Sequence, residues 1–161
     1  MTDDWESRVS AVWANADTFG DDEVLGQIDT LVAERDEDDP AALFESASAR
    51  DYVGLEDQAE PLYRRAIDAG LDEPRLGQAA IQLASTLRNL GKHDEALEVL
   101  ESHFGTGAEH PLDDAARAFL ALILSSKGEE RAALSVALGA LARHLPAYQS
   151  SVRSYAAELL D

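Results

Sequence analysis

Three glycines stand 37 residues apart in this chain and mark a repeating pattern. Gly54, Gly91 and Gly128 are each followed by an acidic amphipathic segment that carries small residues on one face. A fixed period of this length is typical of repeat proteins, in which similar units stack side by side. Stacked units present an extended surface for partners rather than one enclosed reaction pocket. The period therefore favours a binding role over catalysis.

Four prolines follow nearly the same period, and each precedes an apolar stretch with helical spacing. Pro40, Pro74, Pro111 and Pro146 lie 34, 37 and 35 residues apart. Proline is favourable at the first helical position, because its missing N–H would have no partner within the helix. Each proline is therefore predicted to start a helix that ends near the next glycine. A second helix then returns to the next proline, which gives a run of helical hairpins.

Apolar residues recur with three- and four-residue spacing, and no useful length of chain alternates with a period of two. We predict a single all-α domain of about nine helices, at residues 4–18, 21–35, 40–53, 56–69, 74–90, 93–104, 111–127, 130–143 and 146–160. Residues 1–39 form a degenerate hairpin, and three repeats follow at 40–73, 74–110 and 111–145. Residues 146–161 form a capping helix whose inward stripe is Tyr148, Val152, Tyr155 and Leu159. Pro61 predicts that the fourth helix starts late or bends.

The second helices of the hairpins share a motif of two positions, four residues apart. The first position holds Ala59, Ala96 and Ala133, and the second holds Tyr63, Leu100 and Ala137. This pattern resembles the tetratricopeptide repeat (TPR) family, whose unit of about 34 residues carries W-x2-L-G-x2-Y…A-x3-F…P. The first helices match less well, because the position of the motif Trp holds Leu43, Ala80 and Arg117. The resemblance covers residues 40–144 and implies a right-handed solenoid of antiparallel helical hairpins.

The net charge is strongly negative, −19, from 32 acidic and 13 basic side chains, and residues 1–40 hold 13 of the acidic ones. Such a surface repels phosphate backbones and anionic lipids, so we expect no nucleic-acid and no membrane binding. The acidic N-terminal region is interpreted either as a docking surface for a basic partner or as a solubilising surface. No apolar run reaches the roughly 20 residues that span a bilayer, and the acidic start is unlike a signal peptide. We expect a cytoplasmic protein.

No group of residues predicts catalysis or a bound metal or cofactor. His103 and His110 flank a glycine loop beside Glu109, but their spacing fits no known metal motif. The acidic run 36–39 lacks the glycine and the distal Glu of a calcium loop, and it is expected to cap the helix at Pro40. We therefore predict a non-enzyme with no catalytic residue, no cofactor and no metal site.

In the TPR family the first helices line a concave groove that holds a peptide, and the resemblance implies the same here. The residues expected to contact a partner protein or peptide are Phe44, Ser48, Tyr52, Gln78, Gln82, Ser85, Arg88, Asn89, Phe119, Leu122 and Ser126. Arg88 has two possible roles, capture of a partner carboxylate or pairing with Asp51, which stands 37 residues earlier. The alternatives to a peptide-binding protein are a homo-oligomer whose groove is filled by its own C-terminal helix or a second copy, and a subunit active only within a larger complex.

Overall fold

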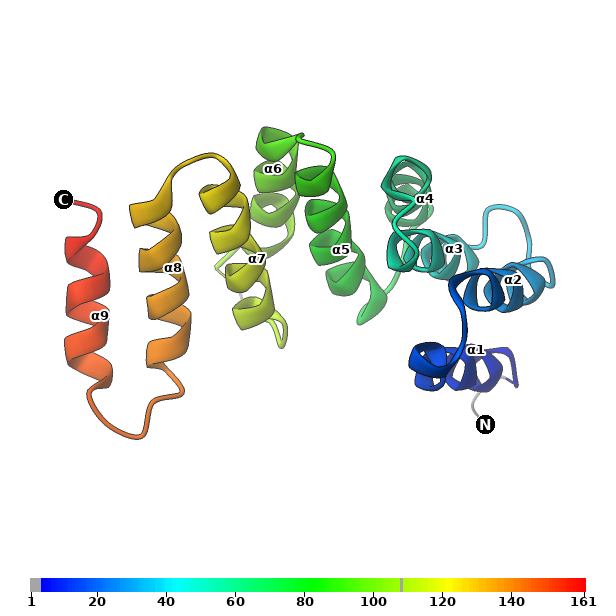
Figure 1. The fold of residues 1–161 in the computed structure, drawn as a ribbon, viewed down its shortest axis with the longest axis horizontal. Helices are drawn as coiled ribbons and strands as arrows, with labels where there is room; N and C mark the ends of the chain where they lie inside the picture. Colours follow the sequence, from blue (N-terminus) through cyan, green and yellow to red (C-terminus); the bar gives the residue numbers. More distant parts are fainter. Residues whose placement is uncertain (1–3, 108) are drawn as a thin grey trace. The chain divides into compact units, whose positions relative to one another are not determined.

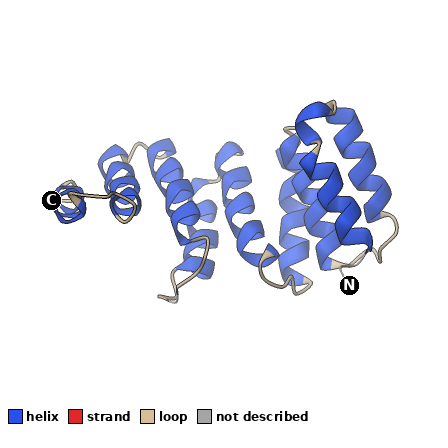
Figure 2. Cartoon of the chain, turned by 90° about the horizontal axis from the view of Figure 1, so that it is seen from below, coloured by secondary structure: helices blue, strands red, loops and turns tan. Residues whose placement is uncertain are grey.

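The computed structural model describes residues 4–107 and 109–161. These residues form nine α-helices and one short 3₁₀ helix, and they contain no strand (Figures 1 and 2). The elements are α1 (Asp4–Ala14), the 3₁₀ helix η1 (Ala16–Thr18), α2 (Asp21–Val32), α3 (Pro40–Tyr52), α4 (Glu56–Asp68), α5 (Arg75–Asn89), α6 (His93–Phe104), α7 (Asp113–Ser126), α8 (Glu130–Ala142) and α9 (Gln149–Glu158). The predicted all-α fold is confirmed.

The first predicted helix ends earlier than expected, because polar side chains take over its last carbonyl groups. Asn15 donates from Nδ2 to Ala11 O at 2.8 Å, and Thr18 donates from Oγ1 to Asn15 O at 2.7 Å. Such local bonds compete with the helical pattern. The chain therefore leaves α1 at Ala14 and forms the 3₁₀ turn η1. By contrast, α4 begins at Glu56 and continues through Pro61, so it does not start late.

Of the four repeating prolines, only Pro40 lies at the start of a helix as the sequence predicts. The Asp39 carboxylate caps α3 by accepting a hydrogen bond from Ala42 N at 2.9 Å. Pro74, Pro111 and Pro146 lie one to three residues before the first residues of α5, α7 and α9. At α5 the Glu73 carboxylate accepts a hydrogen bond from Gly77 N at 3.1 Å, so the capping group precedes the proline.

The repeating glycines end α3, α5 and α7 with one recurrent turn. Gly54, Gly91 and Gly128 have positive φ angles of 78°, 76° and 80°. The next residue in each case donates its N–H to a carbonyl five residues earlier: Leu55 to Arg50 at 2.8 Å, Lys92 to Leu87 at 2.8 Å, and Glu129 to Leu124 at 2.9 Å. This is the glycine-based helix stop in which a left-handed residue reverses the chain. The 37-residue period of the sequence therefore corresponds to a left-handed glycine turn that recurs at the same spacing.

The chain divides into two units, Met1–Thr86 and Leu87–Asp161, and the boundary falls within α5. In the first unit, α1, α2 and α3 share a core around Trp5, whose Nε1 donates to Leu31 O at 2.8 Å. The buried residues of this cluster are Trp5, Val9, Val12, Ala16, Val24, Ile28, Leu31, Ala42 and Ala49. The helices α3 and α4 form the next hairpin, where the small residues Ala59 and Ala66 are fully buried and permit close helix packing.

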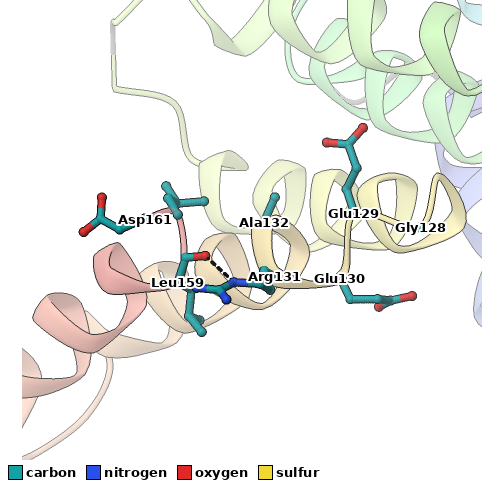
Figure 3. A pocket seen from close by; sticks show the side chains of 8 residues that line it. Gly128, Glu129, Glu130, Arg131, Ala132, Leu159 and Asp161 are labelled. Atoms are coloured by element: carbon teal, nitrogen blue, oxygen red, sulfur yellow. Dashed lines mark hydrogen bonds between the residues drawn. The ribbon is translucent and has the colours of Figure 1, made fainter.

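In the second unit, α7, α8 and α9 lie side by side (Figure 1). The side chain of Arg131, in the first turn of α8, reaches the end of α9 and donates from Nε to Leu159 O at 2.8 Å (Figure 3). This bond satisfies one of the carbonyls that a helix end leaves without a partner. The cavity beside it, of about 540 Å³, is lined by Glu129, Glu130 and Asp161 among other residues.

The predicted inward stripe of the last helix is partly wrong. Tyr148 and Tyr155 are 80% and 64% exposed, whereas Ala156 is buried and Val152 and Leu159 are half-buried. Residues 152, 156 and 159 lie on one helical face, and the small Ala156 lets that face approach its neighbour closely. The tyrosines therefore point outward. No described helix is long and apolar enough to cross a membrane.

Candidate protein-binding surface

The residues expected at the binding surface lie on the first helices of the hairpins, and they divide between the two units. The first unit holds Phe44, Ser48 and Tyr52 on α3, together with Gln78, Gln82 and Ser85 on α5. The second unit holds Arg88 and Asn89 at the end of α5, and Phe119, Leu122 and Ser126 on α7. We describe each set within its own unit.

Phe44 does not lie at the surface. Its side chain is 6% exposed, its ring centre is 6.1 Å from that of Tyr63, and the Arg75 guanidinium lies 5.9 Å from its centre. A ring enclosed in this way contributes to packing and is not accessible to a partner. The sequence predicted a groove position for Phe44 because its place on the helix allows either environment, and the neighbouring Tyr63 decides between them.

Ser48 and Gln82 are joined through a buried tyrosine. The Tyr63 hydroxyl donates to Gln82 Oε1 at 2.8 Å, and Ser48 Oγ donates to the same oxygen at 3.1 Å. Burial, followed by the nearby negative charge of Asp51, raises the pKa of Tyr63, so its hydroxyl remains a proton donor at neutral pH. The half-buried Ser48 and Gln82 are therefore held in fixed orientations at the surface of the first unit.

Asp51 extends this network beneath the surface. Its Oδ1 accepts a hydrogen bond from Thr86 Oγ1 at 2.9 Å, and its Oδ2 lies 3.5 Å from the Tyr63 hydroxyl. Burial raises the pKa of Asp51, although the hydrogen bond from Thr86 opposes this change. Asp51 thus has a hydroxyl partner within its own unit, whereas Arg88, the partner considered from the sequence, belongs to the second unit.

Tyr52 forms an exposed aromatic corner with Trp13 of α1. The side chain of Tyr52 is 46% exposed, and the edge of its ring faces Trp13 with the centres 5.9 Å apart. Trp13 is half-buried and donates from Nε1 to Glu45 Oε2 at 2.7 Å. A Trp on a helical apolar stripe is usually core, so sequence reasoning missed this contribution. Its polar N–H, which needs a partner when enclosed, was the available signal.

The carboxylate behind this corner is almost fully buried and is neutralised by arginine. Glu45 Oε1 accepts two hydrogen bonds from Arg75, at 3.0 and 3.1 Å, and Arg75 also binds Glu6 at 2.6 Å. Burial alone would lower the pKa of Arg75, but the hydrogen bonds to Glu6 and Glu45 outweigh it and raise the pKa. The guanidinium therefore remains charged and fixes α1, α3 and α5 to one another.

In the second unit, Arg88 contacts two other residues of the expected set. Its Nε donates to Ser126 Oγ at 2.8 Å, and an amino group donates to Asn89 Oδ1 at 3.2 Å. Leu122, one turn before Ser126 on α7, is 46% exposed, and Phe119 on the same helix is half-buried. The second unit thus brings together an arginine, an amide, a hydroxyl and an exposed leucine, and these groups offer both polar and apolar contacts.

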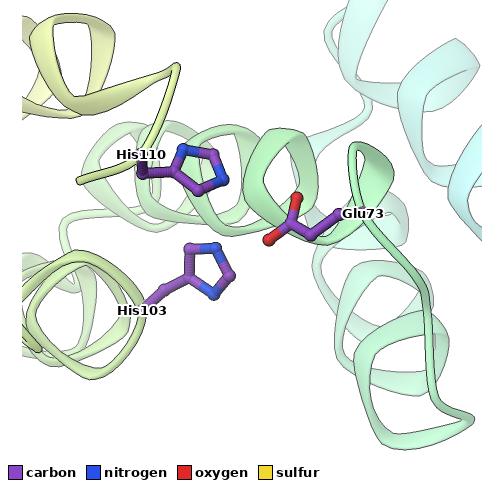
Figure 4. A group of neighbouring side chains, drawn as sticks. All are labelled: Glu73, His103 and His110. Carbon is purple, nitrogen blue, oxygen red and sulfur yellow. The ribbon is translucent and has the colours of Figure 1, made fainter. Parts of the chain in front are cut away.

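The two histidines considered as metal ligands lie together in the second unit (Figure 4). The ring centres of His103 and His110 are 5.5 Å apart, and His110 Nδ1 accepts a hydrogen bond from Leu112 N at 3.0 Å. Glu73, also drawn there, belongs to the first unit, where it caps α5. Within either unit by itself, the described residues offer no three close His or carboxylate ligands for a metal ion.

Comparisons with known proteins agree with this architecture. A family model described as tetratrico peptide repeat matches residues 40–159. A solved structure from Podosopora anserina, described as nearly identical TPR-like repeats of a kinesin light chain, is 19% identical with a TM-score of 0.69. The match covers 99% of this chain and 94% of that one.

Two further solved structures are similar. A single-substitution variant of the Podosopora anserina repeats is also 19% identical with a TM-score of 0.69, and the match covers 96% of this chain and 90% of that one. A MamA RS-1 double mutant is 17% identical with a TM-score of 0.64, over 99% of this chain and 92% of that one. These low identities support the fold alone. No curated protein matches the sequence.

Proposed function

Because this chain belongs to the tetratricopeptide repeat family, we propose that it is a non-enzymatic module that binds a segment of a partner protein. The family fold generally serves as a scaffold for protein–protein interaction. The proposed contacts are side chains on the first helices of the hairpins, other than the buried Phe44. They comprise Ser48, Tyr52, Gln78, Gln82 and Ser85 in the first unit, and Arg88, Asn89, Phe119, Leu122 and Ser126 in the second.

The observation that carries the proposal is that polar groups on these surfaces are already oriented. Ser48 and Gln82 are held by Tyr63, and Arg88 is held by Ser126. Groups fixed before binding lose little conformational freedom when a partner arrives. Each set also includes an exposed apolar side chain, Tyr52 in the first unit and Leu122 in the second, which supplies area for an anchor contact.

The net charge of −19 supports a basic partner for these surfaces. Long-range attraction mainly speeds the encounter, and it weakens as salt screens the charges. The final affinity then depends on the buried anchor contacts. We therefore expect the association rate to fall with ionic strength, while substitutions at Tyr52 or Leu122 act chiefly on dissociation.

The test is quantitative capture of partners from the native lysate with matched variants. Tyr52→Ala and Arg88→Ala should each reduce a specific prey at least about tenfold, the effect of losing a contact worth roughly 1.4 kcal/mol. Tyr155→Ala removes an exposed tyrosine outside the proposed surface, and Arg64→Ala removes the same charge as Arg88→Ala at a position on α4. Both controls should retain the prey.

Unchanged capture by Tyr52→Ala and Arg88→Ala would refute the proposed surface. Light scattering of the purified chain separates the alternative in which the surface is filled by a second copy. A dimer or larger oligomer that Tyr52→Ala or Arg88→Ala dissociates would favour that alternative, whereas a monomer would exclude it. A catalytic activity that remains with the chain through purification would contradict the non-enzymatic assignment.

A further inference from the structure

A cavity in the second unit is lined by three arginines, although arginine and lysine are scarce in this chain. It lies between α7, α8 and α9 and has a volume of about 440 Å³. Arg117 comes from α7, Arg143 from the C-terminal end of α8 and Arg153 from α9. The remaining lining residues are Leu120, Val136, Gly139 and Ala140, so no carboxylate of the described residues lines the cavity. We call it the arginine pocket.

One carboxylate of the protein already binds at the edge of this group. Asp114 accepts hydrogen bonds from Arg143 and from His144 Nε2, the latter at 2.7 Å, and it lies 3.5 Å from Arg117. The hydrogen bond from His144, followed by that from Arg143, lowers the pKa of Asp114. Among the described residues, Asp114 is the one carboxylate that contacts any of these guanidinium groups, and it contacts Arg117 and Arg143 but not Arg153, so positive charge is in excess.

Gly139 lines the arginine pocket. It lies in the interior of α8, where glycine costs roughly 0.5–1 kcal/mol relative to alanine. A Cβ added there would meet no other atom within 4 Å, and Gly139 does not have the positive φ that would require glycine. Neither packing nor backbone geometry requires a glycine here, and a side chain at this position would extend into the open space of the pocket. Larger side chains at this position would occupy the pocket.

A second cavity of about 360 Å³ shares Arg117 and Leu120 with the arginine pocket. Most of its lining is apolar and includes Leu97, Leu100, Phe104 and Ala116. The acidic residues Glu101 and Asp113 also line this second cavity. They repel a carboxylate there and leave the arginine pocket as its favourable position. A ligand that fills both cavities therefore needs an apolar side chain next to an acidic one.

We propose that the arginine pocket binds the side-chain carboxylate of an acidic peptide segment, with a neighbouring leucine-like side chain in the adjoining cavity. Planar guanidinium groups bind carboxylates in paired, directional hydrogen bonds. The net charge of −19 disfavours polyanions such as nucleic acids, whose charge extends far beyond one pocket. A short segment with few carboxylates and apolar neighbours meets the local positive charge with much less long-range repulsion than a polyanion.

This site is separate from the surface proposed above for the main function. Successive residues of a helix are about 100° apart, so Arg117 and Leu120 share one side of α7 while Leu122 and Ser126 share the opposite side. Arg117 occupies the position at which the family motif has a tryptophan. A cation there exchanges core packing for charge, which agrees with a local binding role. Loss of one site should leave the other intact.

The experiment is an NMR titration of the ¹⁵N-labelled full chain with two short peptide probes. The first is acetyl-Glu-Leu-Glu-Leu amide, and the second replaces both glutamates by glutamine. We expect saturable shifts in α7, α8 and α9 with the acidic peptide, and binding at least about tenfold weaker with the glutamine peptide, as for the loss of a hydrogen bond to a charged group. Equal binding of the two peptides would overturn the proposal.

Matched variants locate the site. Arg153→Ala should lower the affinity for the acidic peptide about tenfold or more. Arg64→Ala removes the same charge in the first unit and should change that affinity by less than about twofold, because distant exposed charges are screened. Gly139→Leu should abolish binding by filling the pocket, and Gly139→Ala should largely retain it. Unchanged affinity in Arg153→Ala or Gly139→Leu would contradict the site.

Other occupants of the pocket give distinct results. A glutamine peptide with a free C-terminal carboxylate that bound more tightly than the acidic amide would assign the pocket to a chain terminus and overturn the side-chain assignment. Self-association that Arg153→Ala abolished would assign it to a second copy and overturn the peptide assignment. Inorganic phosphate and acetate can be compared as competitors of the acidic peptide. If phosphate displaced the peptide at a lower concentration than acetate did, the carboxylate assignment would be overturned in favour of a phosphate ligand.

Discussion

Replacing Tyr63 by phenylalanine removes one buried hydroxyl from the network that orients Ser48 and Gln82. The fully buried hydroxyl makes one short bond, 2.8 Å to Gln82 Oε1, and longer contacts of 3.4 and 3.5 Å to Ser48 and Asp51. A typical hydrogen bond contributes a net 0.5–1.5 kcal/mol or so, and an orphaned buried partner costs roughly 1–3 kcal/mol. Gln82 Oε1 keeps the Ser48 hydroxyl at 3.1 Å, which limits that penalty. We expect Tyr63→Phe to destabilise the protein by about 1–2 kcal/mol.

The assay is urea unfolding followed by tryptophan fluorescence. Both tryptophans, Trp5 and Trp13, lie in the first unit with Tyr63, so the signal reports on the affected unit. The midpoint should fall with an unchanged slope, because the surface exposed on unfolding is the same. Tyr155→Phe, at an exposed position, is the control and should change stability by less than about 0.5 kcal/mol. A Tyr63→Phe midpoint equal to the wild type would refute the claim that this hydroxyl holds the network.

Two further predictions concern charge and backbone geometry. Burial raises the pKa of Asp51, so the folded chain binds this proton more tightly than the unfolded chain does. The stability of the protein therefore falls as the pH rises from the ordinary aspartate pKa through the higher pKa of the folded state. The stability of the Asp51→Asn variant relative to wild type should therefore increase over this pH range and then stay constant at higher pH. Urea unfolding at several pH values measures this difference, and a difference that does not change with pH would contradict the prediction. Gly128→Ala should destabilise the protein by roughly 1 kcal/mol, because Gly128 has a φ of 80° that alanine rarely adopts. Gly26→Ala within α2 should stabilise it by about 0.5–1 kcal/mol, because a Cβ there meets no other atom. Thermal unfolding should therefore show a lower melting temperature for Gly128→Ala and a higher one for Gly26→Ala.

The helix pattern was predictable because it depends on local chemistry that repeats along the chain. Gly54 and its two counterparts adopt left-handed turns that other residues rarely accept, so their spacing in the sequence is also the spacing of the hairpins. Pro40 acted as predicted because Asp39 stands immediately before it as a cap. The later prolines lie ahead of their helices instead. At α5, for example, the capping contact comes from Glu73, four residues before the N–H that it accepts from.

The surface was less predictable, because the environment of each side chain depends on the neighbouring helices. Phe44 and Tyr52 lie two turns apart on α3, yet one is enclosed by Tyr63 and the other faces outward beside Trp13. Arg88 likewise contacts Ser126, 38 residues away on α7, a contact within the second unit that the repeat pattern does not indicate. Helical spacing indicates which residues share a face, but it does not indicate which of them a neighbouring helix will cover.

Departures from the repeat motif carry information that the motif itself does not. Where the motif is kept, as at Ala59 and Ala96, the side chain is fully buried and its role is packing between helices. At Arg117 the large motif side chain is replaced by an exposed cation, and two other arginines line the same cavity. Asp114 already pairs with Arg117 and Arg143, but one carboxylate does not balance three guanidinium groups, and like charges held near one another repel. A second carboxylate, supplied by the proposed peptide beside Arg153, would relieve this remaining repulsion.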